Sequence, residues 1–142
     1  MTINEKKKYL RQYRGLLREE RQLMDEIERV KASAFPHSLG VSPAPGGSGT
    51  EHDLSDWAAK WDLLERELMA AREKAAETRI RIEHSLQSLE NVDERRILRG
   101  YYVHGKRVER VAKEIPCSTS TAWRIYKSAL QHFDPGDHVE SK

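Results

Sequence analysis

The chain has 142 residues, of which 37% are hydrophobic, 34% are charged and 7% are aromatic. A charged fraction above the usual ~25% argues against one large globular core and favours long helices with narrow apolar faces. No apolar stretch approaches the ~20 residues of a membrane-spanning helix, and the first ten residues lack the apolar segment of an export signal. We therefore expect a cytoplasmic protein with no membrane partner. The single cysteine, Cys117, excludes an internal disulfide and a CxxC metal framework.

The charges are distributed unevenly, although the net charge of the whole chain is only +2. Residues 91–133 contain nine Lys or Arg residues against four Asp or Glu residues, which gives this segment a net charge of +5. A basic segment of this kind can neutralise backbone phosphates, so it is the candidate region for nucleic-acid binding.

The N-terminal segment has the pattern of an amphipathic helix that ends near Lys31. Thr2 and Glu5 have the spacing of a capping box, which predicts the start of the helix. Residues on one side then alternate at spacings of four and three, with a single polar break, and this pattern predicts packing against a partner helix. These positions are Tyr9, Tyr13, Leu16, Glu20, Leu23, Ile27 and Val30.

A second long helix is predicted from Leu54 to Leu89, after a flexible loop over residues 33–53. The loop contains three of the five prolines and four of the eight glycines. Because a loop of this length closes at small entropic cost, we favour an antiparallel hairpin of residues 1–90 over pairing of the two apolar faces between chains. Trp57 and Trp61 lie on the apolar face of the second helix and are interpreted as core residues, not as a cofactor site.

Residues 91–133 have the pattern of three short helices with a tight turn between the last two, which predicts a C-terminal helix-turn-helix. Residues 134–142 are predicted to form a flexible tail, so the fold class is all-α. The predicted buried positions are Ile97, Leu98, Tyr101 and Tyr102 in the first short helix, Val108, Val111, Ala112 and Ile115 in the second, and Ala122, Ile125, Ala129 and Leu130 in the third.

The last helix of a helix-turn-helix enters the major groove of DNA by its N-terminal part. Short polar side chains there can approach base edges, basic residues further along reach guanine edges or phosphates, and basic residues of the preceding helix flank the groove. The predicted DNA-binding residues are Lys106, Arg107, Arg110, Ser118, Thr119, Ser120, Thr121, Trp123, Arg124 and Lys127.

Three residues of this region have alternative interpretations. Arg99 either pairs with Glu114 or binds a phosphate. Trp123 either packs at the edge of the helix bundle or contacts a thymine methyl group or a sugar. Cys117 is interpreted as a replacement for a buried aliphatic residue in the turn.

Residues 90–130 read ENVDERRILRGYYVHGKRVERVAKEIPCSTSTAWRIYKSAL. This stretch resembles the C-terminal part of the phage RinA-type transcriptional activators and the related ArpU-like phage regulators, which are themselves similar to region 4 of sigma factors. The strongest part of the resemblance is Ser118-x-x-Thr121-Ala122-x-Arg124-Ile125. The chain departs from many sigma-type relatives at Pro116, where they have Gly, and at Thr119, where they have Arg or Asp. The resemblance implies a phage-encoded activator of late genes that acts with host RNA polymerase.

The sequence-level hypothesis is therefore a regulator that binds double-stranded DNA as a homodimer, because one helix-turn-helix makes few contacts alone. The alternative is a coiled-coil adaptor or packaging-related protein whose C-terminal helices bind RNA polymerase or another protein. No HExxH, GxSxG or Walker pattern occurs, and Gly46-Gly47-Ser48-Gly49 lacks the lysine of a phosphate-binding loop. We expect neither catalysis nor a cofactor or metal.

Overall fold

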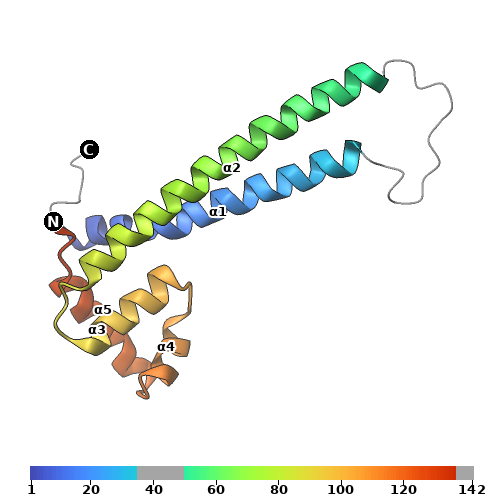
Figure 1. Cartoon of the computed structure of the whole chain (residues 1–142). Helices are drawn as coiled ribbons and strands as arrows, with labels where there is room; N and C mark the ends of the chain where they lie inside the picture. Colours follow the sequence, from blue (N-terminus) through green and yellow to red (C-terminus); the bar gives the residue numbers. More distant parts are fainter. Residues whose placement is uncertain (35–49, 137–142) are drawn as a thin grey trace. The chain divides into compact units, whose positions relative to one another are not determined.

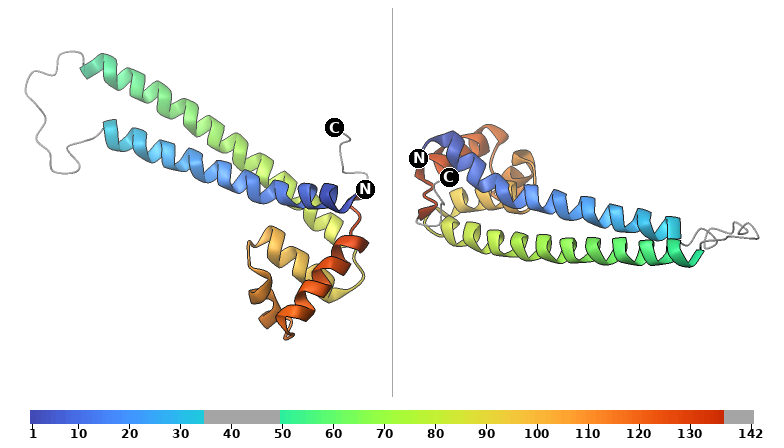
Figure 2. Two further views of the ribbon diagram at one scale, coloured as in Figure 1. Left: turned by 180° about the vertical axis from the view of Figure 1, so that it is seen from behind. Right: turned by 90° about the horizontal axis from the view of Figure 1, so that it is seen from above.

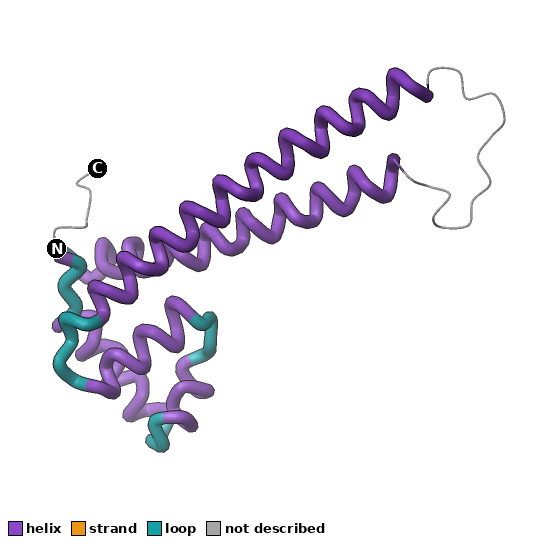
Figure 3. The backbone as a smooth tube through the Cα atoms, in the orientation of Figure 1, coloured by secondary structure: helices purple, strands orange, loops and turns teal. Residues whose placement is uncertain are grey.

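The computed structural model describes residues 1–34 and 50–136 (Figure 1). All regular elements within these residues are helices, so the predicted all-α fold is confirmed (Figure 3). No helix in this described part is long and apolar enough to cross a membrane. The elements are α1 (Ile3–Ala34), α2 (Thr50–Leu86), α3 (Val92–Leu98), the π-helical turn η2 (Arg99–Val103), α4 (Val108–Glu114) and α5 (Thr119–His132).

The contacts group the chain into two units, and the division falls inside the long helices. One unit runs from Leu17 to Glu73, and the other combines Met1–Leu16 with the chain from Lys74 onward. The sequence pattern predicts a division at residue 90, between the hairpin and the short helices. The structure differs because the first turns of α1 and the last turns of α2 pack with the short helices.

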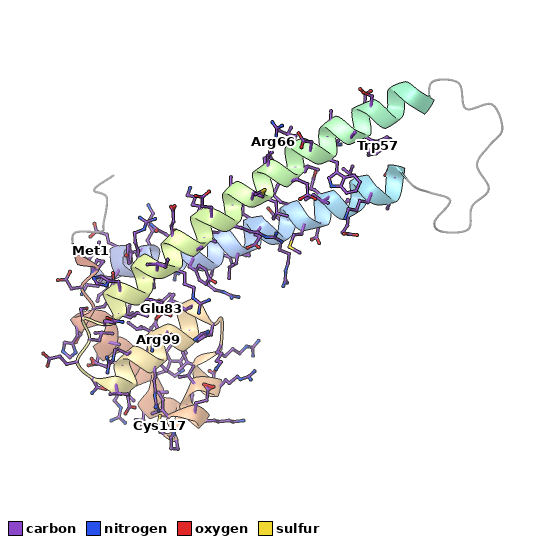
Figure 4. The ribbon with its side chains drawn as sticks, viewed as in Figure 1. Met1, Trp57, Arg66, Glu83, Arg99 and Cys117 are labelled. Atoms are coloured by element: carbon purple, nitrogen blue, oxygen red, sulfur yellow. The ribbon has the colours of Figure 1, made fainter. Side chains whose placement is uncertain are left out.

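The unit from Leu17 to Glu73 is an antiparallel hairpin in which α1 and α2 lie side by side (Figures 1 and 2). Trp57 of α2 points toward α1 (Figure 4). Arg72 donates to Glu20 over 2.9 Å, so the polar break in the α1 pattern has a partner on α2. The apolar faces therefore pair within the chain, as predicted, around a core of Ile27, Val30, Leu64 and Leu68 with Leu23, Trp57 and Trp61 against it.

The long helices extend beyond their apolar patterns, so the predicted loop 33–53 was too long at both ends. The first helix continues to Ala34 and the second begins at Thr50. The apolar periodicity marks only the buried face of each helix, and backbone hydrogen bonding carries the helix past that face. The remaining part of the predicted loop, residues 35–49, lies outside the described residues.

The ends of α1 and α2 in the other unit are joined to the chain that follows α5. The Tyr9 hydroxyl lies 3.2 Å from Ser85 Oγ, and Ser85 Oγ lies 3.2 Å from the Pro135 carbonyl oxygen. Lys6 Nζ donates to the carbonyl oxygens of Leu130 and Gln131, each over 2.9 Å, and so satisfies carbonyl groups at the end of α5. Residues 134–136 of the predicted tail are thus part of the packed unit, whereas residues 137–142 lie outside the described residues.

The three short helices form the helix-turn-helix arrangement, with α5 packed against both α3 and α4. Asn91 caps α3, because its Oδ1 accepts from the backbone N–H groups of Asp93 and Glu94 over 2.8 and 3.1 Å. The buried Glu94 carboxylate contacts His132 Nδ1 at 2.7 Å and thereby links α3 to the last turn of α5. Three predicted core positions were wrong, since Tyr101 is exposed and Ile115 and Ile125 are only half-buried. Tyr126 lies in the core in place of Ile125.

Gly100 lets η2 approach α4 closely, whereas Gly15 in α1 has open space around it. Replacement of each glycine by alanine should therefore change the free energy of unfolding in opposite directions. A Cβ atom at Gly100 would lie 2.7 Å from Val111 Cγ2, whereas a Cβ atom at Gly15 in α1 would meet nothing within 4 Å. We expect Gly100→Ala to lower the free energy of unfolding by about 1–3 kcal/mol through overpacking. Gly15→Ala should raise it by about 0.5–1 kcal/mol through helix propensity. Urea unfolding followed by circular dichroism measures both.

Val111→Ala supplies the control, because it removes the methyl group that the new Cβ atom would strike. The Gly100→Ala/Val111→Ala double variant should therefore lose less stability than the sum of the two single variants. Additive losses would show that the contact between η2 and α4 does not cause the effect.

Candidate nucleic-acid interface

The turn between α4 and α5 fixes where the last helix starts. The backbone N–H of Cys117 donates to the Ala112 carbonyl over 2.9 Å, which closes the turn after α4. Ser118 is extended and caps α5, since its Oγ accepts from the Thr121 N–H over 3.1 Å and donates to Thr121 Oγ1 over 2.9 Å. The side chains of Ser118 and Thr121 are therefore engaged in capping the N-terminus of α5, and Thr121 is also half-buried. The Cys117 thiol is free and half-buried, so it is less buried than expected.

The side of α5 that faces away from the core carries most of the predicted DNA-binding residues. Ser120, Trp123, Arg124 and Lys127 recur at spacings of three and four, and all four are exposed. Thr119 is exposed in the first turn of the same helix. Neither Arg124 nor Lys127 forms an ion pair with any residue in the described part of the chain. Their charges are thus available to an external anion.

Trp123 lies at the edge of an aromatic cluster that reaches into the core. Its ring meets the Tyr126 ring edge-on, with 5.4 Å between the ring centroids, yet the residue remains 39% exposed. Tyr126 is buried, and its hydroxyl lies 2.6 Å from the hydroxyl of Tyr102. Tyr101 contacts the same ring, with centroids 5.6 Å apart. The packing interpretation of Trp123 is correct, and enough of the ring stays exposed to contact a ligand.

Burial raises the pKa values of Tyr102 and Tyr126, and the hydrogen bond that the Tyr102 hydroxyl donates to Tyr126 adds to the rise at Tyr102. Tyrosines in an unfolded chain ionise at about pH 10. The stabilisation linked to the two raised pKa values is therefore fully present below that pH, and it is lost as the pH rises through the pKa values of Tyr102 and Tyr126 in the folded protein. We expect at least two of the five tyrosines to stay un-ionised until helix content falls. Phenolate absorbance recorded together with circular dichroism tests this, and ionisation of all five in the folded protein would contradict it.

The basic residues near α4 divide into exposed and paired side chains. Arg107, which precedes α4, and Arg110 within it are both exposed. Lys106 instead contacts Glu114 at 2.6 Å, and this hydrogen bond lowers the pKa of the Glu114 carboxyl. The structure therefore leaves the side chains of Arg107 and Arg110 exposed and assigns Lys106 to an intramolecular pair.

Arg99 does not pair with Glu114, which corrects one of its two predicted interpretations. Its Nε donates to Glu83 of α2 over 2.9 Å, and the two side chains point toward each other in Figure 4. A partner 16 residues earlier in the sequence, on another helix, could not be found from local spacing.

A cavity of about 360 Å³ lies between η2 and α4, lined in part by Arg96, Arg99, His104 and Lys106. Arg99 and Lys106 already have carboxylate partners, as described above, whereas Arg96 is exposed and forms no ion pair with any residue in the described part of the chain. Among the residues that the structure describes, no group of three or more His, Cys, Asp or Glu side chains could hold a metal ion.

Two residues near the interface were missed by the sequence analysis. Tyr101 is 36% exposed and shares Tyr126 with Trp123, although it was expected to be part of the core. Arg11 of α1 acts electrostatically on both Tyr102 and Tyr126 and favours their ionised forms. Nothing in the sequence pattern links residue 11 to residues 102 and 126.

The comparison with protein families gives one match. The family described as "Protein of unknown function (DUF1492)" matches residues 57–134, which is more than half of the chain and includes α3, η2, α4 and α5. No curated protein and no solved structure matches the chain. The chain therefore belongs to the DUF1492 family of proteins of unknown function.

Proposed function

We propose that this protein is a transcriptional regulator that binds the major groove of double-stranded DNA with the N-terminal half of α5. The observation that carries the proposal is the exposed face of α5, where Arg124 and Lys127 form no ion pair with any described residue. A helix of 14 residues that presents its first two turns in this way has the form that enters a major groove. Arg107 and Arg110 add exposed positive charge for the DNA backbone.

The more specific form of the proposal rests on the resemblance to phage regulators. It is a phage-encoded activator of late genes, acting in the cytoplasm of the bacterial host, with host RNA polymerase as a partner. We propose a homodimer, since paired helix-turn-helix units on two half-sites are the common solution. Light scattering that gives the monomer mass of 16.5 kDa at micromolar concentration would contradict the dimer.

A salt titration of DNA binding tests the central proposal. Fluorescence anisotropy with labelled duplex fragments should show binding that weakens as salt rises. If Arg107, Arg110, Arg124 and Lys127 each neutralise a phosphate, the slope of log K against log salt should approach about −3 to −4 per monomer. Absence of binding to phage-genome or random duplex DNA at low salt would overturn the proposal.

A second candidate function, a protein-binding adaptor, is favoured by exposed apolar residues on α2. Leu63 is 56% exposed and Met69 is 68% exposed in the hairpin unit, and large exposed apolar side chains can mark protein interfaces. A protein partner recovered by pull-down after nuclease treatment, combined with no DNA binding, would favour this function over the first.

A further inference from the structure

The exposed tryptophan on α5 is unusual for the surface on which it lies. The other exposed residues of that face, Ser120, Arg124 and Lys127, are polar or charged. Trp123 is 39% exposed, so part of its large apolar ring is in contact with solvent. An aromatic side chain that is partly exposed among polar groups gains free energy when a ligand covers its apolar surface.

The ring is also held in place before any ligand binds. Trp123 packs edge-on against Tyr126, with an interplanar angle of 81°. Tyr126 is itself held in place, because it is buried and its hydroxyl forms a hydrogen bond with the hydroxyl of the buried Tyr102. A side chain already restrained in this way loses little conformational entropy on binding, which increases the affinity that its contacts provide.

The base that offers an apolar group in the major groove is thymine, through its C5-methyl group. We infer that Trp123 is a specificity-determining residue that contacts the methyl group of one thymine in the DNA site. The inference rests on the proposed function, because it requires α5 to lie in the major groove.

The position of Trp123 on the helix indicates that this thymine is not the base contacted by Arg124. Consecutive residues on an α-helix differ by about 100° around its axis. Ser120 and Lys127 fall between Trp123 and Arg124 around the helix, and Trp123 lies on the side nearer Tyr126. The two residues therefore contact separate positions of one site.

Deoxyuridine substitution tests the inference with the full chain. The probe is a duplex selected from a randomised pool, in which each thymine is replaced in turn by deoxyuridine, a change that removes one methyl group and leaves base pairing intact. We expect one replacement to weaken wild-type binding about fourfold, the value for one buried methyl-sized group. The Trp123→Ala variant should bind the thymine and deoxyuridine duplexes equally. Lys127→Ala, the matched control on the same face, should bind more weakly to both while the fourfold difference persists.

The outcomes separate this inference from the proposed function. If wild type binds the selected duplex but no thymine replacement matters, or the selected site has no thymine, the inference is overturned and the DNA-binding proposal stands. Equal sensitivity of wild type and Trp123→Ala to deoxyuridine also overturns it, because the methyl group then contacts another residue. Failure of wild type to bind any duplex overturns the proposed function itself. If Trp123→Ala no longer unfolds cooperatively, Trp123→Gln replaces it, since its methylene groups can still pack on Tyr126.

Discussion

Replacement of Phe133 by alanine is expected to lower the free energy of unfolding by about 3–5 kcal/mol, the usual cost of truncating a buried Phe. Phe133 is 1% exposed, although it follows the last residue of α5. Its ring centroid lies 6.1 Å from that of Tyr9 in α1, and its backbone N–H donates to the Ala129 carbonyl over 2.8 Å. The residue thus fills the space between the first turns of α1 and the end of α5. Removal of the ring leaves a cavity at that junction.

Phe133→Leu is the matched control, because it keeps an apolar side chain at the site and should cost less than about 1.5 kcal/mol. Chemical unfolding followed by circular dichroism gives both values. A loss below 1 kcal/mol for Phe133→Ala would show that the surrounding side chains close the cavity, so that the junction is less tightly packed than the structure indicates.

The long helices were predictable because their pattern is local and repeated. Apolar residues at spacings of three and four determine the buried face of each helix, so the pairing of Ile27 and Val30 with Leu64 and Leu68 followed from periodicity. The limits of the helices were less predictable, because a helix continues after its buried face ends. The packing of Pro135 at Ser85 was not predictable at all, since it joins residues 50 positions apart in the chain.

In the short helices, the sequence identified the elements but not the details of their contacts. The sequence pattern predicts a core position for the aliphatic Ile125 and not for Tyr126, because Tyr126 carries a polar hydroxyl group. Tyr126 can be buried because its hydroxyl finds Tyr102 on another element. The pairing of Lys106 with Glu114 was also missed, although both residues were visible in the basic segment. Such pairs depend on how the helices pack, and composition alone cannot distinguish a free cation from a paired one.

The largest effect on DNA binding is expected from Arg124. If its guanidinium binds a guanine edge in the proposed site, Arg124→Ala should weaken binding to the selected duplex by about 1–3 kcal/mol and relax the sequence preference at one position. The side chain is exposed and unpaired within the described residues, so the substitution should leave the stability of the fold nearly unchanged. Competition assays with point-substituted duplexes measure the change in preference.

Two controls separate base recognition at Arg124 from general electrostatics. Lys127→Ala should weaken binding to all duplexes by a similar factor and reduce the magnitude of the salt slope by about one, as expected for a phosphate contact. Arg21→Ala removes an exposed arginine from the hairpin unit, and it should change neither affinity nor sequence preference. If Arg124→Ala weakens binding to every sequence equally, as Lys127→Ala does, then Arg124 contacts the DNA backbone and base selection must come from other residues of α5.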